Sequence, residues 1–325
     1  MTTMNPITIC PSTLSEGYDT YSPVASRRLF DGRTVSPYLD YAPIDDDSQP
    51  ATQEEFMHNQ ERISLSGVQP KYSMVVRNGK LRLTEEGEQG RYILKPKLSD
   101  FRNRLYSAAN ENLTMQIAAQ VFGIETAENG LCFFRGGEAA YIVKRFDVKP
   151  DGTKRRKEDF ASLAGLTAQN GGQNYKYDVL TYEECGDLIR RYLPAWRVEM
   201  LKFFDLVVFN FLVCNGDAHL KNFSVLETES GDFRLAPAYD LINTKLHVDD
   251  RIFALGVRET AGTPRKDSPP GVGPILRLVF LAGQADSELL PVRRTERSVP
   301  QYVPRTPRLL SEGRIVKQGK IIEPQ

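Results

Sequence analysis

Residues 215–224 read Asn-Gly-Asp-Ala-His-Leu-Lys-Asn-Phe-Ser, and this stretch is informative because it places Asp217 and Asn222 five positions apart. The apolar pattern predicts a long helix before it, at 197–210, and a short strand after it. In a loop between these elements the two side chains can converge from opposite sides of one turn. The carboxylate can then accept the proton of a hydroxyl group while the amide oxygen holds Mg²⁺ beside phosphates. His219, between them, is expected to brace the loop by hydrogen bonding.

A second carboxylate, Asp240, lies 18 positions after Asn222, within Leu-Ala-Pro-Ala-Tyr-Asp-Leu at 235–241. The short apolar segments on either side of 227–232 predict a β-hairpin between the two sites. Protein kinases have the same order, with a second metal-binding Asp after the strand pair. Alone, Asp217 and Asn222 are more typical of a plain turn. With Asp240 at the position where kinases have their second metal-binding Asp, the pattern favours a site that binds a metal ion and phosphates.

Further candidates lie upstream. Ser-Leu-Ser-Gly-Val-Gln-Pro-Lys at 64–71 precedes the first predicted strand, and its small residues suit a loop whose backbone amides approach phosphates. Lys95 ends the strand segment at 92–95, from which a cation can reach the phosphates, and Glu111 is the candidate to hold Lys95 by an ion pair. Each also has a plainer interpretation, as a loop before a strand, a surface lysine and an acid in the first turn of a helix.

The composition excludes several classes of protein. The 325 residues contain no apolar run long enough to span a membrane, and no signal peptide is recognisable, so we expect a cytoplasmic protein. Four scattered cysteines and three histidines argue against a disulfide framework and against a zinc site. The net charge of zero hides an acidic start, with three basic and nine acidic residues in 1–60, and a basic end, with twelve basic and seven acidic residues in 256–325.

The middle of the chain predicts two lobes. Residues 61–147 form a small α+β lobe, with a hairpin signal at Asn78-Gly79 and a helix at 110–121. The helix is predicted from apolar residues four apart on one face, which are Leu113, Ile117 and Val121. Residues 148–255 form a mostly helical lobe, with helices at 181–192 and 197–210. The predicted strands of the small lobe are 71–76, 80–83, 91–94, 130–134 and 139–146.

The two ends of the chain differ in composition from its middle. Residues 1–60 hold six prolines and an acidic run at 45–47, which predicts extended structure, either as a solvated leader or as a packed accessory arm. Residues 256–325 hold nine of the twenty prolines and nine arginines, and only 275–282 is an apolar element there. We expect this tail to be largely disordered.

Taken together, the chain resembles the HipA family of bacterial toxin serine/threonine kinases, over about 61–255. The Ser-x-Ser before the glycine is similar to the short HipT-like branch. The resemblance implies a two-lobed, protein-kinase-like α+β fold whose large lobe is incomplete or divergent after about residue 255. It rests on seven matching segments: 64–71, 92–96, 110–112, 143–147, 157–163, 215–224 and 235–241.

The resemblance also implies roles for single residues. ATP and Mg²⁺ would be the cofactors, Asp217 the catalytic base, and Asn222 and Asp240 the metal ligands. Lys95, supported by Glu111, would contact the ATP phosphates. Residues 144–146 would form the hinge whose backbone meets adenine, although many relatives have Glu where this chain has Lys144. The full implied set of ATP-binding residues is Ser66, Gly67, Val68, Gln69, Lys95, Lys144, Arg145, Phe146, His219 and Asp240.

Ser64 and Ser66 match family sites of autophosphorylation, where a phosphate would repel ATP. The resemblance implies a protein substrate, an aminoacyl-tRNA synthetase, and as partners a small helix-turn-helix antitoxin and a separate N-subdomain-like protein. Direct nucleic-acid or membrane binding is not expected. Two alternatives stay open: a catalytically impaired nucleotide- or antitoxin-binding module, because the large lobe diverges, and a small-molecule kinase, which shares the spacing of Asp217, Asn222 and Asp240.

Overall fold

The computed structural model describes residues 7–43, 69–98, 101–248, 254–256, 315–317 and 320–322. The chain separates into two units, Met1–Leu289 and Leu290–Gln325. In the second unit, the described residues form an antiparallel hairpin of β9 (Ile315–Lys317) and β10 (Lys320–Ile322). The predicted apolar element at 275–282 and most of the predicted disorder lie outside the described residues. The following paragraphs concern the first unit.

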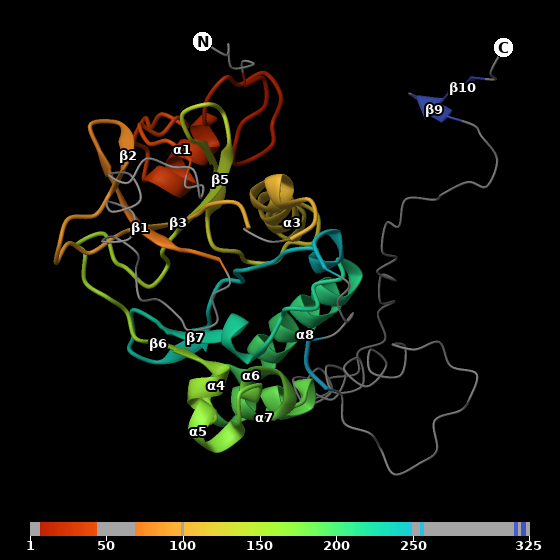
Figure 1. Ribbon diagram of the computed structural model, residues 1–325. Helices are drawn as coiled ribbons and strands as arrows, with labels where there is room; N and C mark the ends of the chain where they lie inside the picture. Colours follow the sequence, from red (N-terminus) through yellow and green to blue (C-terminus); the bar gives the residue numbers. More distant parts are fainter. Residues whose placement is uncertain are drawn as a thin grey trace, which may run out of the picture. The chain divides into compact units, whose positions relative to one another are not determined.

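A five-stranded antiparallel sheet forms the small lobe, in the order β2-β1-β3-β5-β4 (Figure 1). Asn78 and Gly79 both have positive φ, 51° and 69°, which a tight two-residue hairpin between β1 and β2 requires. The five predicted strands are confirmed, with their ends moved by one or two residues. They are β1 (Tyr72–Arg77), β2 (Lys80–Leu83), β3 (Tyr92–Lys95), β4 (Asn129–Phe133) and β5 (Ala139–Lys144).

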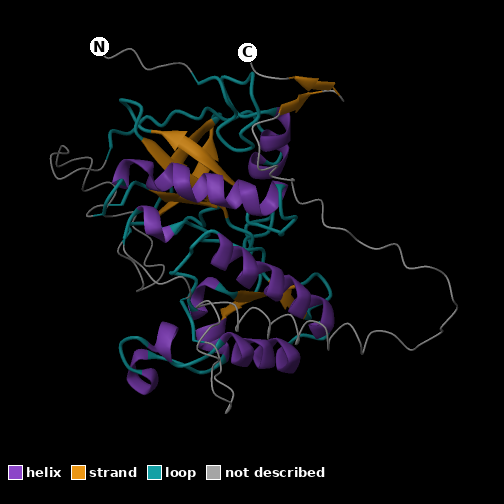
Figure 2. Cartoon of the chain, turned by 90° about the vertical axis from the view of Figure 1, so that its right-hand side faces the viewer, coloured by secondary structure: helices purple, strands orange, loops and turns teal. Residues whose placement is uncertain are grey.

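Helix α3 (Ser107–Gln120) packs on one side of this sheet, and Figure 2 shows a helix crossing it. The helix is confirmed, but of the three apolar residues that predicted it only Ile117 packs, partly buried, against the core. Leu113 is 49% exposed and Val121, just past its end, is 73% exposed, whereas Glu111 and Met115 are buried. The buried face meets polar groups: Gln116 Nε2, for example, donates to Asn129 Oδ1 at 3.1 Å. The buried face of α3 therefore combines core residues such as Met115 and Ala118 with polar groups that have partners in other segments.

The opposite side of the sheet is covered by the N-terminal segment 7–43. The sequence did not predict its helix α1 (Pro23–Phe30), which is capped by Ser22 Oγ, an acceptor from Ala25 N at 3.2 Å, and carries proline in its first turn. Leu29 and Phe30 are fully buried among strand residues of the sheet. For residues 7–43 the packed arm is therefore the structure formed, while the acidic run at 45–47 lies outside the described residues.

The large lobe contains the two predicted helices, α7 (Tyr182–Tyr192) and α8 (Trp196–Leu212). Thr181 caps α7 in a reciprocal arrangement, accepting from Glu184 N at 3.3 Å while Glu184 Oε2 accepts from Thr181 N at 2.8 Å. The predicted hairpin is β7 (Ser224–Glu227) with β8 (Phe233–Leu235), and an unpredicted strand, β6 (Lys157–Asp159), extends it. Short helices complete the lobe: α4 (Phe160–Leu163), α5 (Ala168–Gly171), α6 (Tyr175–Asp178) and the 3₁₀ turns Leu220–Asn222 and Thr244–Leu246. A third 3₁₀ turn, Arg104–Tyr106, directly precedes α3 in the small lobe.

Aromatic side chains form the centre of the large lobe. Phe203 lies against Phe160 and Phe223, with ring centroids 5.8 and 5.2 Å apart. Leu255 is buried in the same cluster, and Tyr182 N donates to Gly256 O at 3.2 Å, so residues 254–256 cover part of α7. In the part of the chain that the structure describes, no helix is long and apolar enough to cross a membrane.

Phe30→Ala tests whether the N-terminal segment stabilises the small lobe. We expect the free energy of unfolding, measured by denaturant titration, to fall by about 3–5 kcal/mol, because the substitution empties a fully buried position. Val24→Ala on the same helix is the control, since Val24 is 40% exposed and should change stability by less than about 1 kcal/mol. Equal stability of the two variants would show that the segment contributes nothing to the lobe.

Candidate functional site

The loop that carries Asp217 is anchored before it reaches that residue. Asn215 is buried, and its Nδ2 donates to Asn210 Oδ1 of α8 at 2.8 Å and to Asp240 O at 3.5 Å. Gly216 N donates to Thr244 Oγ1 at 3.0 Å. These bonds connect the helix end, the loop and the segment after Asp240, so the two acidic residues hold a fixed relation although 23 positions separate them.

Asp217 and Asn222 are brought together as a hydrogen-bonded turn. Asn222 Nδ2 donates to Asp217 O at 3.1 Å, and among the described residues the amide oxygen of Asn222 accepts no hydrogen bond. His219 braces the same turn through its backbone, since its N donates to Asp217 O at 2.7 Å and its O accepts from Asn222 N at 2.9 Å. The Asp217 side chain is exposed, and its Oδ1 accepts a hydrogen bond from the Tyr177 hydroxyl.

Lys95 is the centre of a buried ion cluster. Its Nζ lies 2.6 Å from Glu111 Oε1 and also donates to Asp240 Oδ1, and the Tyr141 ring lies 5.3 Å below it. Burial alone would lower the pKa of Lys95, but the carboxylates of Asp240 and Glu111 raise it above its ordinary value. The ammonium group is therefore held charged between the two lobes.

The two carboxylates around Lys95 differ. Burial raises the pKa of Glu111 above its ordinary value, with Lys95 opposing the shift. For Asp240, burial acts in the same direction, yet Lys95 and Lys71 lower the pKa below its ordinary value. Asp240 also has a left-handed backbone, with φ of 57°, which Asp tolerates better than most residues. Asp240 is thus an ionised carboxylate aimed at two lysines.

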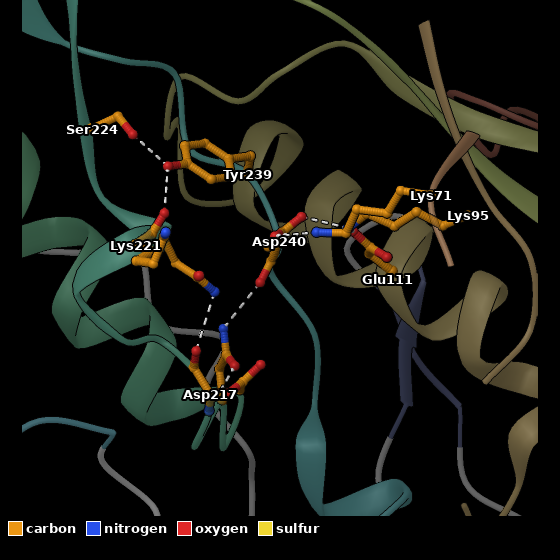
Figure 3. Close-up of polar contacts among 10 residues, drawn as sticks. Lys71, Lys95, Glu111, Asp217, Lys221, Ser224, Tyr239 and Asp240 are labelled. Atoms are coloured by element: carbon orange, nitrogen blue, oxygen red, sulfur yellow. Dashed lines mark hydrogen bonds and ion pairs between the residues drawn. The ribbon is translucent and has the colours of Figure 1, made fainter. Parts of the chain in front are cut away.

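Lys71 was not among the predicted site residues. Its Nζ lies 3.7 Å from Asp240 Oδ2, so it adds a second cation to the cluster from the beginning of β1 (Figure 3). The only sequence signal for it is its position at the end of the 64–71 segment. Lys176 and Tyr177 of α6 were also missed, because nothing in their local pattern relates them to Asp217.

Backbone pairing joins the lobes just before Asp240. Ala127 N donates to Ala238 O and Ala238 N donates to Glu125 O, both at 2.8 Å. Tyr239 Oη then donates to Lys221 O at 2.8 Å, which ties the segment to the loop that carries Asp217. Figure 3 shows Tyr239 reaching Ser224 and Lys221 on one side while Asp240 reaches the lysines on the other.

Two cavities meet at this cluster. One, of about 330 Å³, is lined by Tyr177, Asp217 and His219, and the other, of about 290 Å³, by residues 144–146. Both are lined by Lys71, Lys95, Asn222 and Asp240. The predicted hinge and the predicted catalytic loop therefore face opposite ends of one site, with the ion cluster between them. Gln69 and Glu111 line the first cavity.

The hinge differs in detail from what the resemblance implies. Lys144 N donates to Glu128 O at 2.8 Å and Arg145 N donates to Arg91 O at 2.9 Å, so both amides are used within the small lobe. The Lys144 side chain binds the end of α1, with Nζ 2.9 Å from Arg28 O and 2.5 Å from Asp31 Oδ1. Lys144 therefore has a structural partner in the N-terminal segment. Four other predicted residues, Ser64, Ser66, Gly67 and Val68, lie outside the described residues.

The donor set fits a metal ion that is shared with phosphates. Among the described residues, no group of three or more His, Cys, Asp or Glu side chains could hold a metal alone. Mg²⁺ is commonly bound by one or two carboxylates together with substrate phosphates, and Asp240 with the amide oxygen of Asn222 matches that pattern. His219 Nδ1 is a buried atom in this wall without a hydrogen-bond partner among the described residues. Burial lowers the pKa of His219, which favours the neutral ring.

Comparisons with known proteins identify the family of this chain. Residues 63–297 match the family model of the HipA-like C-terminal domain. Y4mE of Sinorhizobium fredii, a protein named as a candidate kinase, is 33% identical over 203 residues, which are 58% of this chain and 44% of that protein. The serine/threonine-protein kinase toxin HipA of Shewanella oneidensis is 26% identical over 58% of this chain and 45% of that protein. The chain thus spans less than half the length of these two relatives.

Among solved structures, HipA of Shewanella oneidensis in complex with HipB and operator DNA matches 72% of this chain and 60% of that chain, with a TM-score of 0.51 and 20% identity. This likeness concerns the fold. The family match also extends past residue 255, where the motif pattern ended and where we expected the resemblance to stop. The chain belongs to the family of HipA-like C-terminal domains and has its two-lobed, kinase-like fold.

Proposed function

We propose that this chain is an ATP- and Mg²⁺-dependent protein kinase that transfers the γ-phosphoryl group to a serine hydroxyl. The observation that carries the proposal is the position of Lys95, which binds Glu111 and Asp240 between two cavities, one of which reaches Asp217. Phosphoryl transfer depends mainly on positioning and on charge stabilisation, which such a cluster of cations and carboxylates can supply. The kinase names of the relatives support the same activity.

Each residue has a proposed task. Lys95 and Lys71 bind and neutralise the phosphates, and Glu111 keeps Lys95 in place. Asp240 and the Asn222 oxygen would hold Mg²⁺, which supplies further charge neutralisation when bound. Asp217 accepts the proton of the acceptor hydroxyl as the new bond to phosphorus forms. Because the Lys144 and Arg145 amides are already used, we assign the amide contact with adenine to Phe146.

The finer parts of the proposal rest on the family resemblance. We propose an aminoacyl-tRNA synthetase as the protein acceptor, with growth arrest as the result, and Ser64 and Ser66 as sites of autophosphorylation. A small helix-turn-helix antitoxin and a separate N-subdomain-like protein are the proposed partners. The name of the Shewanella relative, a serine/threonine-kinase toxin, supports serine as the acceptor residue and toxicity as the outcome.

Asp217→Asn tests the catalytic base. We expect transfer from labelled ATP to the chain itself and to synthetases in a bacterial extract to fall at least about 100-fold, because general-base catalysis contributes roughly that factor or more. Asp187→Asn, an exposed acid on α7, is the control and should label like the wild type. Equal labelling by the wild type and Asp217→Asn contradicts the kinase assignment, and thermal stabilisation by ATP without transfer would support the nucleotide-binding module instead.

Lys95→Met tests separately whether the ion cluster stabilises the fold and whether Lys95 binds the ATP phosphates. The variant leaves Glu111 buried without a cation, so the free energy of unfolding should fall by about 3–5 kcal/mol. Adding Glu111→Gln removes the unpaired charge and should restore much of that loss, since Asp240 is 28% exposed and keeps Lys71. Neither variant should show the thermal stabilisation by Mg²⁺ and ATP that we expect of the wild type. Recovery of nucleotide binding in the double variant would argue against a phosphate contact by Lys95.

A further inference from the structure

The short helix α6 places a tyrosine on the proposed catalytic base. The Tyr177 hydroxyl donates to Asp217 Oδ1, and its ring meets the His219 ring edge-on, with centroids 4.9 Å apart and planes inclined by 74°. The two contacts join residues 40 and 42 positions apart, from a surface helix and from the loop that carries Asp217. No role for Tyr177 follows from the catalytic arrangement described above.

The hydroxyl of Tyr177 has the relation to Asp217 that an acceptor needs. A general base must accept a hydrogen bond from the hydroxyl whose proton it will take. In this structure one of the two carboxylate oxygens of Asp217, Oδ1, already accepts from Tyr177, and Tyr177 lines the same cavity as Lys71, Lys95 and Asp240. While Tyr177 stays in place, neither a serine side chain nor water can occupy its position on Oδ1.

The segment that carries Tyr177 is a short helix at the surface of the large lobe. Helix α6 has four residues, none of them buried, and its N-cap Asn174 makes no side-chain capping bond. Gly172, just before it, has a φ of 76°, a conformation that glycine adopts without strain. Tyr175 and Tyr177 are partly buried and pack against the core cluster of the large lobe, so displacing α6 exposes part of two rings but no fully buried side chain. The hydrogen bond to Asp217 and the ring contact with His219 act together with this packing to hold α6 against the catalytic loop.

A second α6 side chain faces the same cavity. Lys176 is half-buried and lines the wall beside Asp217. Burial lowers the pKa of Lys176, and Lys221 and Lys71 add to the shift, while Asp217 opposes it. Helix α6 thus brings a hydroxyl and a cation together to the side of Asp217 on which an acceptor must arrive.

We propose that the Tyr177 hydroxyl marks the acceptor subsite: the acceptor hydroxyl binds to Asp217 Oδ1 in its place, and α6 is the wall that determines which acceptors enter. This inference rests on the proposed kinase function. A serine on a flexible protein segment can replace Tyr177 because its segment displaces α6, whereas water alone gains too few contacts to do so. The resting chain is thereby protected from hydrolysing ATP.

Tyr177→Phe tests this role through hydrolysis of ATP without any protein acceptor. In that reaction the water oxygen bonds to the γ-phosphorus, the bond to the bridging oxygen breaks, ADP leaves and Asp217 takes the proton. Removing the hydroxyl frees Oδ1 for water, so the rate should rise roughly tenfold, the size expected for loss of one competing hydrogen bond to a charged group. Adding Asp217→Asn should abolish the rise. An unchanged or lower rate for Tyr177→Phe overturns the inference.

Tyr175→Phe is the matched control. Tyr175 lies on the same helix, and its hydroxyl makes no hydrogen bond among the described residues, so its hydrolysis rate should equal that of the wild type. A rise in both variants would show that any loosening of α6 is sufficient, and would overturn a specific role for the Tyr177 hydroxyl.

Hydrogen exchange of the chain without nucleotide gives a readout independent of activity. Tyr177→Phe and Asp217→Ala should each speed amide exchange in Tyr175–Asp178 several-fold, and Tyr175→Phe should not. Unchanged exchange in all three would show that the contact does not hold α6.

The two proposals fail differently: if wild-type turnover does not depend on Asp217, the kinase function fails and this inference with it. If turnover depends on Asp217 but ignores Tyr177, only this inference fails.

Discussion

The buried ammonium group of Lys95 is the constraint on which the rest of the site depends. A charge at 5% exposure is tolerable only with partners, and Glu111 from α3 and Asp240 from the large lobe provide them. Because each partner comes from a different segment, the requirement to pair one charge fixes a strand, a helix and the segment after β8 at the same time. The proposed catalytic geometry is in this sense a consequence of charge burial.

The same constraint explains the unusual features around it. Asp240 adopts a left-handed backbone, its neighbour Ala238 pairs with the small lobe, and Asn215 contacts its carbonyl. Helix α3 buries Glu111 and leaves Leu113 in solvent, which reverses the usual preference. The left-handed backbone of Asp240 and the burial of Glu111 each cost free energy. They persist because several surrounding contacts hold these residues in place. They lie at the place where two lobes and two cavities meet.

Local patterns were sufficient to predict the strands, the hairpin turn and the long helices, since their signals lie within a few residues. Pairings across the chain were harder. The apolar stripe of α3 predicted a helix but only part of its buried face, because that face also holds Glu111 and Gln116, whose partners Lys95 and Asn129 lie in other segments. Helix α1 is eight residues long and depends on packing for its stability, so its sequence alone gave no clear signal. The spacing of Asp217, Asn222 and Asp240 indicated the site, whereas Tyr177 has a polar local context and a partner in another segment.

The contact between Lys144 and α1 has a practical consequence for how this lobe can be divided. The motifs begin near residue 61, which suggests that a shorter protein starting there would be self-sufficient. Yet the Lys144 ammonium group binds Arg28 O and Asp31, and Leu29 and Phe30 form the outer layer of the sheet. A fragment that begins at residue 61 would expose one side of the sheet to solvent. Strand β5, which ends at Lys144, would also lose its contact with α1. Any fragment in which both sides of this sheet are shielded from solvent must therefore include residues 7–43.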